Sequence, residues 1–212
     1  MTVADIAVLI GAYLLGSVPF GLVLTRLAGL GDIRQIGSGN IGATNVLRTG
    51  RKDLALLTLL LDAGKGAIAV LLVRHFFDPG LAMFAGAVAF IGHCFPVFLR
   101  FQGGKGVATF FGTLIAMHPV IALFTVGCWL LTAVMFKMSS LAALLAAFVA
   151  PAVAHMIAPG MAPVFILFMS LVIFIRHKEN IQRIAKGAEP KIGGSKSNSE
   201  TSSKDTDTTP PQ

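Results

Sequence analysis

Long apolar runs separated by short polar breaks make up most of this chain. A membrane-spanning helix needs about 20 predominantly apolar residues, and six runs approach that length: 3–25, 53–74, 81–99, 119–136, 141–157 and 161–175. A shorter run, Val107–Met117, ends at His118-Pro119, where one helix is expected to stop and another to begin. The pattern predicts an all-α membrane protein, a polytopic bundle of about seven transmembrane helices, with Pro19 as a tolerated kink. The short seventh run is expected to cross at an angle or through a thinned bilayer.

The Lys and Arg residues indicate how these helices are oriented. With seven crossings, the breaks at 26–52, 100–106 and 137–140 and the chain from Arg176 onwards face one side of the membrane. Every Lys and Arg outside the apolar runs then falls on that side, and only Arg74, the last residue of the second run, lies at the outer end. Basic residues favour the cytoplasmic side, so we expect the N-terminus outside and the C-terminus in the cytoplasm.

Composition agrees with a membrane protein. Residues are 55% hydrophobic and only 13% charged, whereas soluble domains carry about a quarter charged residues. The net charge of +7 comes from basic residues between apolar runs, which favours orientation in the membrane and anionic ligands over nucleic acid. Cys94 and Cys128 are expected to be reduced thiols, and no metal site is expected.

The end of the chain differs from the rest. Residues 1–187 are predicted to form a single transmembrane domain. Residues 188–212 are rich in Gly, Ser, Thr, Asp and Pro, a composition typical of disorder. We therefore expect a disordered cytoplasmic tail whose removal after Gly187 leaves activity nearly unchanged.

The first polar break contains a glycine-rich motif, GSGNIGATN at 37–45, followed by Arg48. It matches G-x-G-x-x-G, but no strand precedes it, which excludes a dinucleotide-binding fold. Glycines let the backbone approach a ligand and form an anion-binding nest. Arg48 suits bidentate binding of a phosphate, and Ser38 and Asn40 suit hydrogen bonds to hydroxyls. A flexible linker would not need these polar residues between its glycines.

Two further motifs lie in later breaks that we expect on the same side. Gly103-Gly104-Lys105-Gly106 precedes a predicted helix, whose N-terminal amides and Lys105 suit an anion, although it is not a Walker A sequence. After the last run, His177 and Asn180 are three apart and share a helix face.

Two opposite charges lie within the second apolar run. Asp62 and Lys65 are three apart on a predicted helix. Charges at membrane depth are costly unless they are paired or functional. The two residues are predicted to form an ion pair, and Lys65 is also a candidate to reach the ligand site.

Five segments together resemble one known family. They are GSGNIGATNVLR at 37–48, LDAGKG at 61–66, GHCFPVF at 92–98, GGKGVAT at 103–109 and IRHKENIQR at 175–183. In this order they resemble the bacterial acyl-phosphate:glycerol-3-phosphate acyltransferases, the PlsY family. The resemblance implies a seven-helix enzyme of the bacterial inner (plasma) membrane with its active site on the cytoplasmic side. It also implies transfer of a fatty acyl group from acyl phosphate to the 1-hydroxyl of sn-glycerol 3-phosphate. Lysophosphatidic acid and phosphate would result, in the first step of phospholipid synthesis.

The resemblance and the motifs give a set of expected site residues. The expected catalytic residues are Ser38, Arg48, Lys105, His177 and Asn180. The expected substrate-binding residues are Gly37, Gly39, Asn40, Thr44, Asn45, Lys65, Gly103, Gly104, Gly106 and Thr109. No cofactor is expected. The expected partners are the two substrates, membrane lipid and a phosphate acyltransferase that forms acyl phosphate.

The chemistry of an acyl phosphate agrees with these residues. It is a mixed anhydride with a good leaving group, so no nucleophile from the enzyme is required; alignment and charge neutralisation suffice. Lys105 and the amides of 103–106 suit the leaving phosphate, and the other four catalytic candidates suit the glycerol phosphate. His177 and a substrate phosphate are both candidates to accept the hydroxyl proton.

Two other classes of protein fit the pattern less well. A transporter for phosphorylated solutes would use broken helices and glycine loops too, but should show two-fold sequence symmetry, which is not evident. A membrane scaffold without activity would not need three separate glycine-rich or basic motifs.

Overall fold

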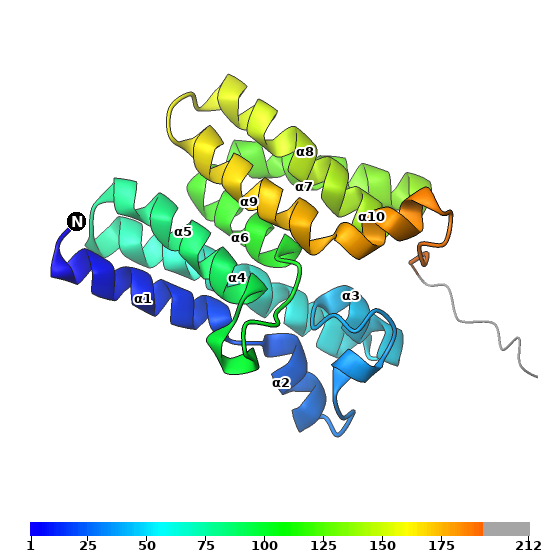
Figure 1. The fold of residues 1–212 in the computed structure, drawn as a ribbon. Coiled ribbons are helices and arrows are strands. Elements are labelled where there is room, and N and C mark those ends of the chain that lie inside the picture. The colour runs from blue at the N-terminus through cyan, green and yellow to red at the C-terminus, as the bar shows by residue number, and fades with distance from the viewer. Residues whose placement is uncertain (193–212) are drawn as a thin grey trace, which may run out of the picture.

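A computed structural model describes residues 1–192, and over that range the chain is helical with no strand (Figure 1). Most of the predicted tail lies outside the described residues. The α-helices are α1 (Val3–Ser17), α2 (Phe20–Leu27), α3 (Ala43–Val46), α4 (Lys52–Phe76), α5 (Pro79–Cys94), α6 (Val107–Met117), α7 (Pro119–Phe136), α8 (Ser139–Ile157), α9 (Ala162–Arg176) and α10 (Lys178–Ala185). Short 3-10 helices occupy Ile33–Gln35, Leu47–Thr49 and Val97–Leu99.

A helix occupies each predicted apolar run, and two helices occupy the first, so the all-α membrane fold is confirmed. Within residues 1–192, four helical segments are long and apolar enough to cross a membrane: α4, α5 continued to Leu99, α7 and α8. The pair α1 and α2 makes a fifth if the two count as one broken span. At 11 and 15 residues, α6 and α9 are shorter. Seven crossings and the orientation of the termini stay predictions.

The first predicted run is not one helix. It divides at Val18-Pro19 into α1 and α2, which are bent by 43°. Proline has no N–H to donate and breaks helices, so the predicted kink is a complete break. The ammonium group of Lys65 donates to the carbonyl of Val18 at 2.9 Å and ties α4 to the break.

Small residues let the helices approach one another closely. A Cβ added at Gly16 would lie 2.0 Å from the carbonyl oxygen of Ala89, where α1 packs against α5. A Cβ at Gly112 would lie 1.9 Å from the carbonyl oxygen of Ala63, where α6 packs against α4. Close backbone contact through small residues is typical of helix packing in membranes.

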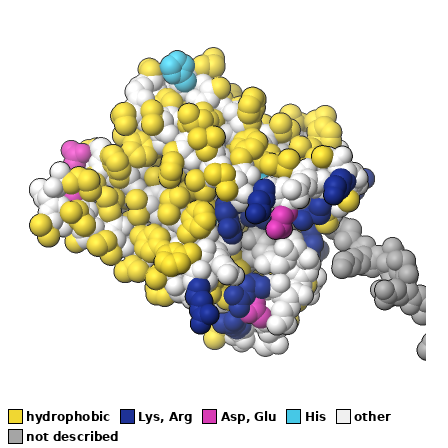
Figure 2. Space-filling model, in the orientation of Figure 1, with side chains coloured by type: hydrophobic (Ala, Val, Ile, Leu, Met, Phe, Trp, Pro, Cys, Tyr) yellow, Lys and Arg dark blue, Asp and Glu magenta, His cyan; other side chains and the backbone are white. Residues whose placement is uncertain are grey.

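On the face that Figure 2 shows, the basic residues gather at one end. Hydrophobic side chains cover most of the face shown, and Lys and Arg gather at the end where α2, α3 and α10 lie. Two contacts join the later polar breaks at this end: Lys105 bonds to Asn180, and the amide of Ile192 donates to the carbonyl of Lys137 at 2.6 Å. The breaks that the sequence assigned to one side therefore lie together.

The candidate active site

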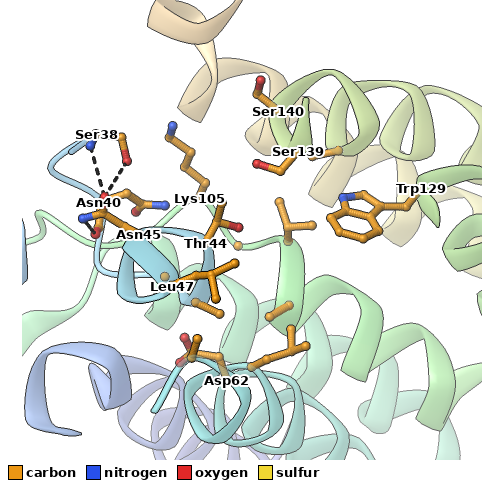
Figure 3. A pocket seen from close by; sticks show the side chains of 18 of the residues that line it. Ser38, Asn40, Thr44, Asn45, Leu47, Asp62, Lys105, Trp129, Ser139 and Ser140 are labelled. Atoms are coloured by element: carbon orange, nitrogen blue, oxygen red, sulfur yellow. Dashed lines mark hydrogen bonds between the residues drawn. The ribbon is translucent and has the colours of Figure 1, made fainter. Parts of the chain in front are cut away.

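A cavity of about 470 Å³ lies between the first polar break and helices α4, α6, α7, α8 and α10 (Figure 3). Its polar lining includes Ser38, Asn40, Thr44, Asn45, Arg48, Lys52, Asp62, His93, Lys105, Ser139, Ser140, His177, Asn180 and Glu189. Its apolar lining includes Leu47, Leu56, Leu59, Val107, Phe111, Val126, Trp129 and Leu130. All five predicted catalytic residues line this one cavity.

Asn45 organises the glycine-rich loop of the first motif. Its amide nitrogen donates to the carbonyl oxygens of Ile33, Ile36 and Asn40 at 2.8–3.0 Å. Its amide oxygen accepts from the backbone N–H of Ser38 at 3.1 Å and from the hydroxyl at 3.3 Å (Figure 3). Asn45 is buried, so its polar groups hold the loop and fix Ser38 at the rim of the cavity.

Two glycines of this loop adopt backbone angles that other residues rarely reach. Gly37 and Gly39 have φ of 58° and 68°, in the left-handed region that favours glycine. A Cβ on Gly37 would also lie 2.6 Å from the amide oxygen of Asn45 and 2.7 Å from Cδ of Arg48. The two predicted binding glycines therefore shape the loop and give room to Arg48, whose exposed side chain lines the cavity.

The second motif contributes Lys105 and the first turn of α6. Gly106, Val107 and Ala108 line the cavity beside Lys105, so the N-terminal end of α6, with its unpaired amides, faces the space. Figure 3 shows the Lys105 side chain reaching between Ser38 and Ser140. Its ammonium group donates to Asn180 Oδ1 at 2.5 Å.

The first two glycines of this motif do not reach the cavity. The amide of Gly104 donates to the carbonyl of His93 at 3.0 Å, and the carbonyls of Gly103 and Gly104 accept from the Arg176 guanidinium at 2.6 and 3.1 Å. The amide of Gly104 is therefore not available to a phosphate, contrary to the expectation for residues 103–106. These glycines anchor the loop that carries Lys105.

Burial lowers the pKa of the Lys105 ammonium group. Loss of hydration and the nearby Arg183 guanidinium lower the pKa of Lys105 to about 8, and the Glu189 carboxylate opposes that shift. Burial disfavours the charged form of a lysine. The Lys105 ammonium is thus charged at neutral pH and close to its titration range.

His177 lies between α9 and α10 with its two ring nitrogens in different surroundings. Nδ1 lies 2.8 Å from the carbonyl oxygen of Ile173. A carbonyl only accepts, so Nδ1 carries the proton and the Nε2 lone pair is left as an acceptor. Burial, with Lys105 nearby, lowers the pKa of His177 to about 4, and the bond to Ile173 opposes that shift. The ring is neutral at physiological pH.

Asp62 forms the predicted ion pair with Lys65. Asp62 Oδ1 lies 2.8 Å from Lys65 Nζ and 3.5 Å from His93 Nδ1. Asp62 and His93 line the cavity, whereas Lys65 is buried and directed to Val18 instead. Thr109 is likewise an expected binding residue outside the cavity lining, as are Gly37, Gly39, Gly103 and Gly104. It is buried where α6 packs against Gly66 of α4.

The apolar part of the cavity opens toward the outer surface. Leu56 and Leu59 of α4 and Leu130 of α7 line the cavity and are also exposed. Phe111 and Trp129 pack edge to face in its lining, with ring centroids 6.4 Å apart. A groove with this lining suits a hydrocarbon chain that extends sideways between α4 and α7.

Several lining residues were not predicted from the sequence. Glu189 lies in the predicted tail, and Ser139 and Ser140 begin α8 without a recognisable motif. Arg176, which binds the carbonyls of Gly103 and Gly104 and does not line the cavity, was recognised from the sequence only as a basic residue at the end of the last apolar run. Among residues 1–192, no three His, Cys, Asp or Glu side chains lie close enough together to hold a metal ion.

The fold and the cavity define a class of membrane protein that brings an anionic group and a long apolar chain together. Comparisons with known proteins agree. A family model described as glycerol-3-phosphate acyltransferase matches residues 6–187. The glycerol-3-phosphate acyltransferase of Jannaschia sp. (strain CCS1) is 60% identical over 182 residues, which cover 86% of this chain and 90% of that protein. The one from Caulobacter vibrioides (strain NA1000 / CB15N) is 56% identical over 191 residues, covering 89% and 88%.

Solved structures give the same result. PlsY (YgiH), described as an integral membrane glycerol 3-phosphate acyltransferase, matches in its glycerol 3-phosphate form with a TM-score of 0.84 and 38% identity, covering 90% of this chain and 96% of that one. Its lysophosphatidic acid form matches with a TM-score of 0.82 and 37% identity. This chain therefore belongs to the glycerol-3-phosphate acyltransferase family and is an integral membrane acyltransferase. The family resemblance that the motifs suggested is confirmed.

Proposed function

We propose that this protein transfers a fatty acyl group from acyl phosphate to the 1-hydroxyl of sn-glycerol 3-phosphate. The hydroxyl oxygen forms a bond to the acyl carbonyl carbon, the bond from that carbon to the phosphate oxygen breaks, and phosphate leaves with the electron pair. The products are lysophosphatidic acid and phosphate. The observation that carries the proposal is one cavity that joins Lys105, Arg48 and His177 to an apolar groove.

The cavity suits two phosphate groups held in one space rather than in two separate sites. Lys105, predicted for the leaving phosphate, contacts Asn180, predicted for the glycerol phosphate. Arg48 approaches from the first motif, and the first turn of α6 adds amides. Cations and amides that are already in place stabilise the charge that develops on the leaving phosphate without reorganisation.

His177 suits orientation of the hydroxyl more than removal of its proton. The Nε2 lone pair accepts a hydrogen bond from the hydroxyl, but a pKa of about 4 makes the ring a weak base. A phosphate monoester has a second pKa of about 6 and is the better acceptor. Of the two candidates from the sequence, this favours a substrate phosphate. The proton then ends on the phosphate group of lysophosphatidate or on the released phosphate, and the reaction balances in either case.

The cellular setting follows from the same proposal. The protein lies in the bacterial inner (plasma) membrane, and its polar end with the cavity faces the cytoplasm. Membrane lipid covers the apolar surface. Because acyl phosphate is the donor, a phosphate acyltransferase that forms acyl phosphate is its functional partner.

The identity of the donor tests the proposal. Purified protein in one detergent is given glycerol 3-phosphate with palmitoyl phosphate or with palmitoyl-CoA at equal concentrations, and lysophosphatidate is detected by mass. We expect turnover with palmitoyl phosphate and little or none with palmitoyl-CoA, because the polar end of the cavity suits single phosphates. Equal rates with the two donors would contradict the assignment.

A matched pair of variants controls this experiment. Arg48→Ala removes a cation that lines the cavity and should abolish most turnover. Arg51→Ala removes a cation that pairs with Asp53 on the exposed surface, and activity should stay close to that of the wild type. Equal losses in both variants would assign the effect to surface charge.

A further inference from the structure

Glu189 makes three hydrogen bonds from a position that the family match does not include. Its carboxylate accepts from Ser140 Oγ at 2.7 Å, from Asn180 Nδ2 at 2.6 Å and from Arg183 Nε at 2.8 Å. Only 6% of the side chain is exposed. Three residues further along the chain, the amide of Ile192 donates to the carbonyl of Lys137. Glu189 therefore joins the N-terminal end of α8 to α10 at the wall of the cavity.

The amide of Asn180 lies between two groups that fix its orientation. A lysine ammonium only donates hydrogen bonds and a carboxylate only accepts them. Asn180 Oδ1 must therefore face Lys105, and Nδ2 must face Glu189, as observed. Without Glu189, only the contact with Lys105 would hold the amide, and the Nδ2 side would have no acceptor to fix it.

The contacts from Lys105 through Asn180 and Glu189 to Arg183 leave the positive charge of Lys105 free to bind an anion. Glu189 pairs with Arg183, which balances the charge of its carboxylate. Asn180 is neutral, so it holds the Lys105 ammonium in place without neutralising it. A carboxylate in direct contact with Lys105 would instead compete with a phosphate for the same charge.

We propose that Glu189 is a positioning residue that orients the Asn180 amide, so that Lys105 is held with its charge free for a substrate phosphate. The inference rests on the proposed function, because it assigns the phosphate of a substrate to Lys105. It also revises the expectation for the tail: residues 188–192 contribute to the site, and removal of the chain after Gly187 should impair it.

Three substitutions test this role. Glu189→Ala removes the orienting contact and should raise the KM for a phosphorylated substrate about tenfold, the scale of one hydrogen bond to a charged group. Glu189→Gln keeps an oxygen for Ser140 and Asn180 and loses only the pair with Arg183, so its KM should stay within about threefold of the wild type. Glu179→Ala is the matched control on α10, because Glu179 is 73% exposed and lies 4.0 Å from Arg183; its KM should not change.

Separate measurements of KM and kcat in each variant distinguish a positioning role from a purely structural one. Loss of folded protein lowers the apparent kcat and leaves KM unchanged, whereas loss of the Lys105 position raises KM. Truncation after Gly187 should raise KM as Glu189→Ala does, and truncation after Ile192 should not. If Glu189→Ala does not fold, Glu189→Asp replaces it. The aspartate side chain is one methylene shorter, so its carboxylate should lose the hydrogen bond to Asn180 and KM should again rise.

The outcomes decide between the possibilities. An unchanged or lower KM in Glu189→Ala, or in Glu189→Asp where that variant replaces it, would overturn the inference, and a lower KM would identify the carboxylate as a competitor of the substrate. A Glu189→Gln enzyme as impaired as Glu189→Ala would assign the effect to charge and overturn it as well. If the wild-type enzyme forms no lysophosphatidate, the proposed function fails and the inference with it. An active wild type with no change in KM overturns the inference alone.

Discussion

Lys105 is a residue whose surroundings bear directly on its proposed role. Its side chain is half-buried, bonded to a neutral amide and close to Arg183. These surroundings lower its pKa to about 8, so the ammonium is charged below that pH and loses its charge above it. A phosphate held by this ammonium should bind more weakly as the pH rises through that range.

Replacement by arginine tests this explanation. In the wild type, the KM for a phosphorylated substrate should rise above pH 8, where Lys105 loses its charge. In Lys105→Arg the guanidinium stays charged to a pH above about 12, so KM should be flat up to about pH 9.5, even if kcat falls because the side chain is larger. KM is measured across this range for each substrate. The same alkaline rise in both enzymes would assign the titration to another group.

Much of the cavity lining was predictable from residue types and spacing, but side-chain direction was not. Ser38, Arg48, Lys105, His177 and Asn180 were identified by their motifs, and all five line the cavity. Lys65, Gly104 and Thr109 were expected at the site and instead form helix and loop contacts. The direction of each of these residues depends on the rotational orientation of α4 or α6 about its own axis, or on the path of the loop before α6. Spacing along the chain does not specify either.

Glu189 shows a different limit of prediction from sequence. It follows Gly187 in a polar stretch with no apolar periodicity, and its partners lie up to 49 residues away in the chain. Only tertiary contacts reveal its place. Composition predicted that the transmembrane domain ends near Gly187, but it did not predict that Glu189 packs against this domain.

Among the helices, α6 has a length that the structure explains. Thr109 and Gly112 of α6 pack against Gly66 and Ala63 of α4, so α6 begins beside the middle of that longer helix. This level lies about 12 residues from the start of α4, or roughly 18 Å at 1.5 Å per residue. The loop before α6 therefore enters the bundle. A start inside the bundle accounts for the short helix, and its crossing at an angle or through a thinned bilayer stays a prediction.

The close packing of α6 on α4 gives a prediction about stability. Gly112→Ala places a Cβ 1.9 Å from a backbone oxygen and should destabilise the protein by about 1–3 kcal/mol, the usual cost of overpacking. Gly127→Ala on α7 is the matched control, because no atom lies within 4 Å of its added Cβ. Thermal unfolding in one detergent compares the two. A midpoint that falls equally in both variants would show that the backbone contact is unimportant.

Hydropathy was sufficient to predict the helices because lipid requires every backbone group to be paired within its own segment. It did not predict the complete break at Pro19 or the division into α1 and α2. A proline allows either a kink or a break, and contacts elsewhere decide between them. Here the bond from Lys65 to Val18 holds the broken form.

In the whole molecule, the polar breaks meet at one end. The contacts of Lys105 with Asn180 and of Ile192 with Lys137 require three separate connections to lie on the same side of the bundle. Arg74, which bonds to the carbonyl of Met117, is the basic residue that the sequence placed at the other end. This arrangement supports an orientation with the basic end in the cytoplasm.

Tags at the two ends of the chain test the orientation in intact cells. A protease added outside should remove an N-terminal tag and leave a C-terminal tag, because the N-terminus is predicted to lie outside and the C-terminus inside. Permeabilised cells provide the control, in which the C-terminal tag should also be cleaved. Cleavage of the C-terminal tag in intact cells would contradict the model.

The sideways opening between α4 and α7 has a consequence for how the reaction is supplied. Leu56, Leu59 and Leu130 belong both to the cavity and to the lipid-facing surface. A donor that enters there diffuses in two dimensions, while glycerol 3-phosphate arrives from solution in three. The effective donor concentration is then its mole fraction in the bilayer, so extra inert lipid slows the enzyme even when the total donor is constant. On the proposed function, lysophosphatidate would leave by the same opening, directly into the leaflet that supplied its acyl chain.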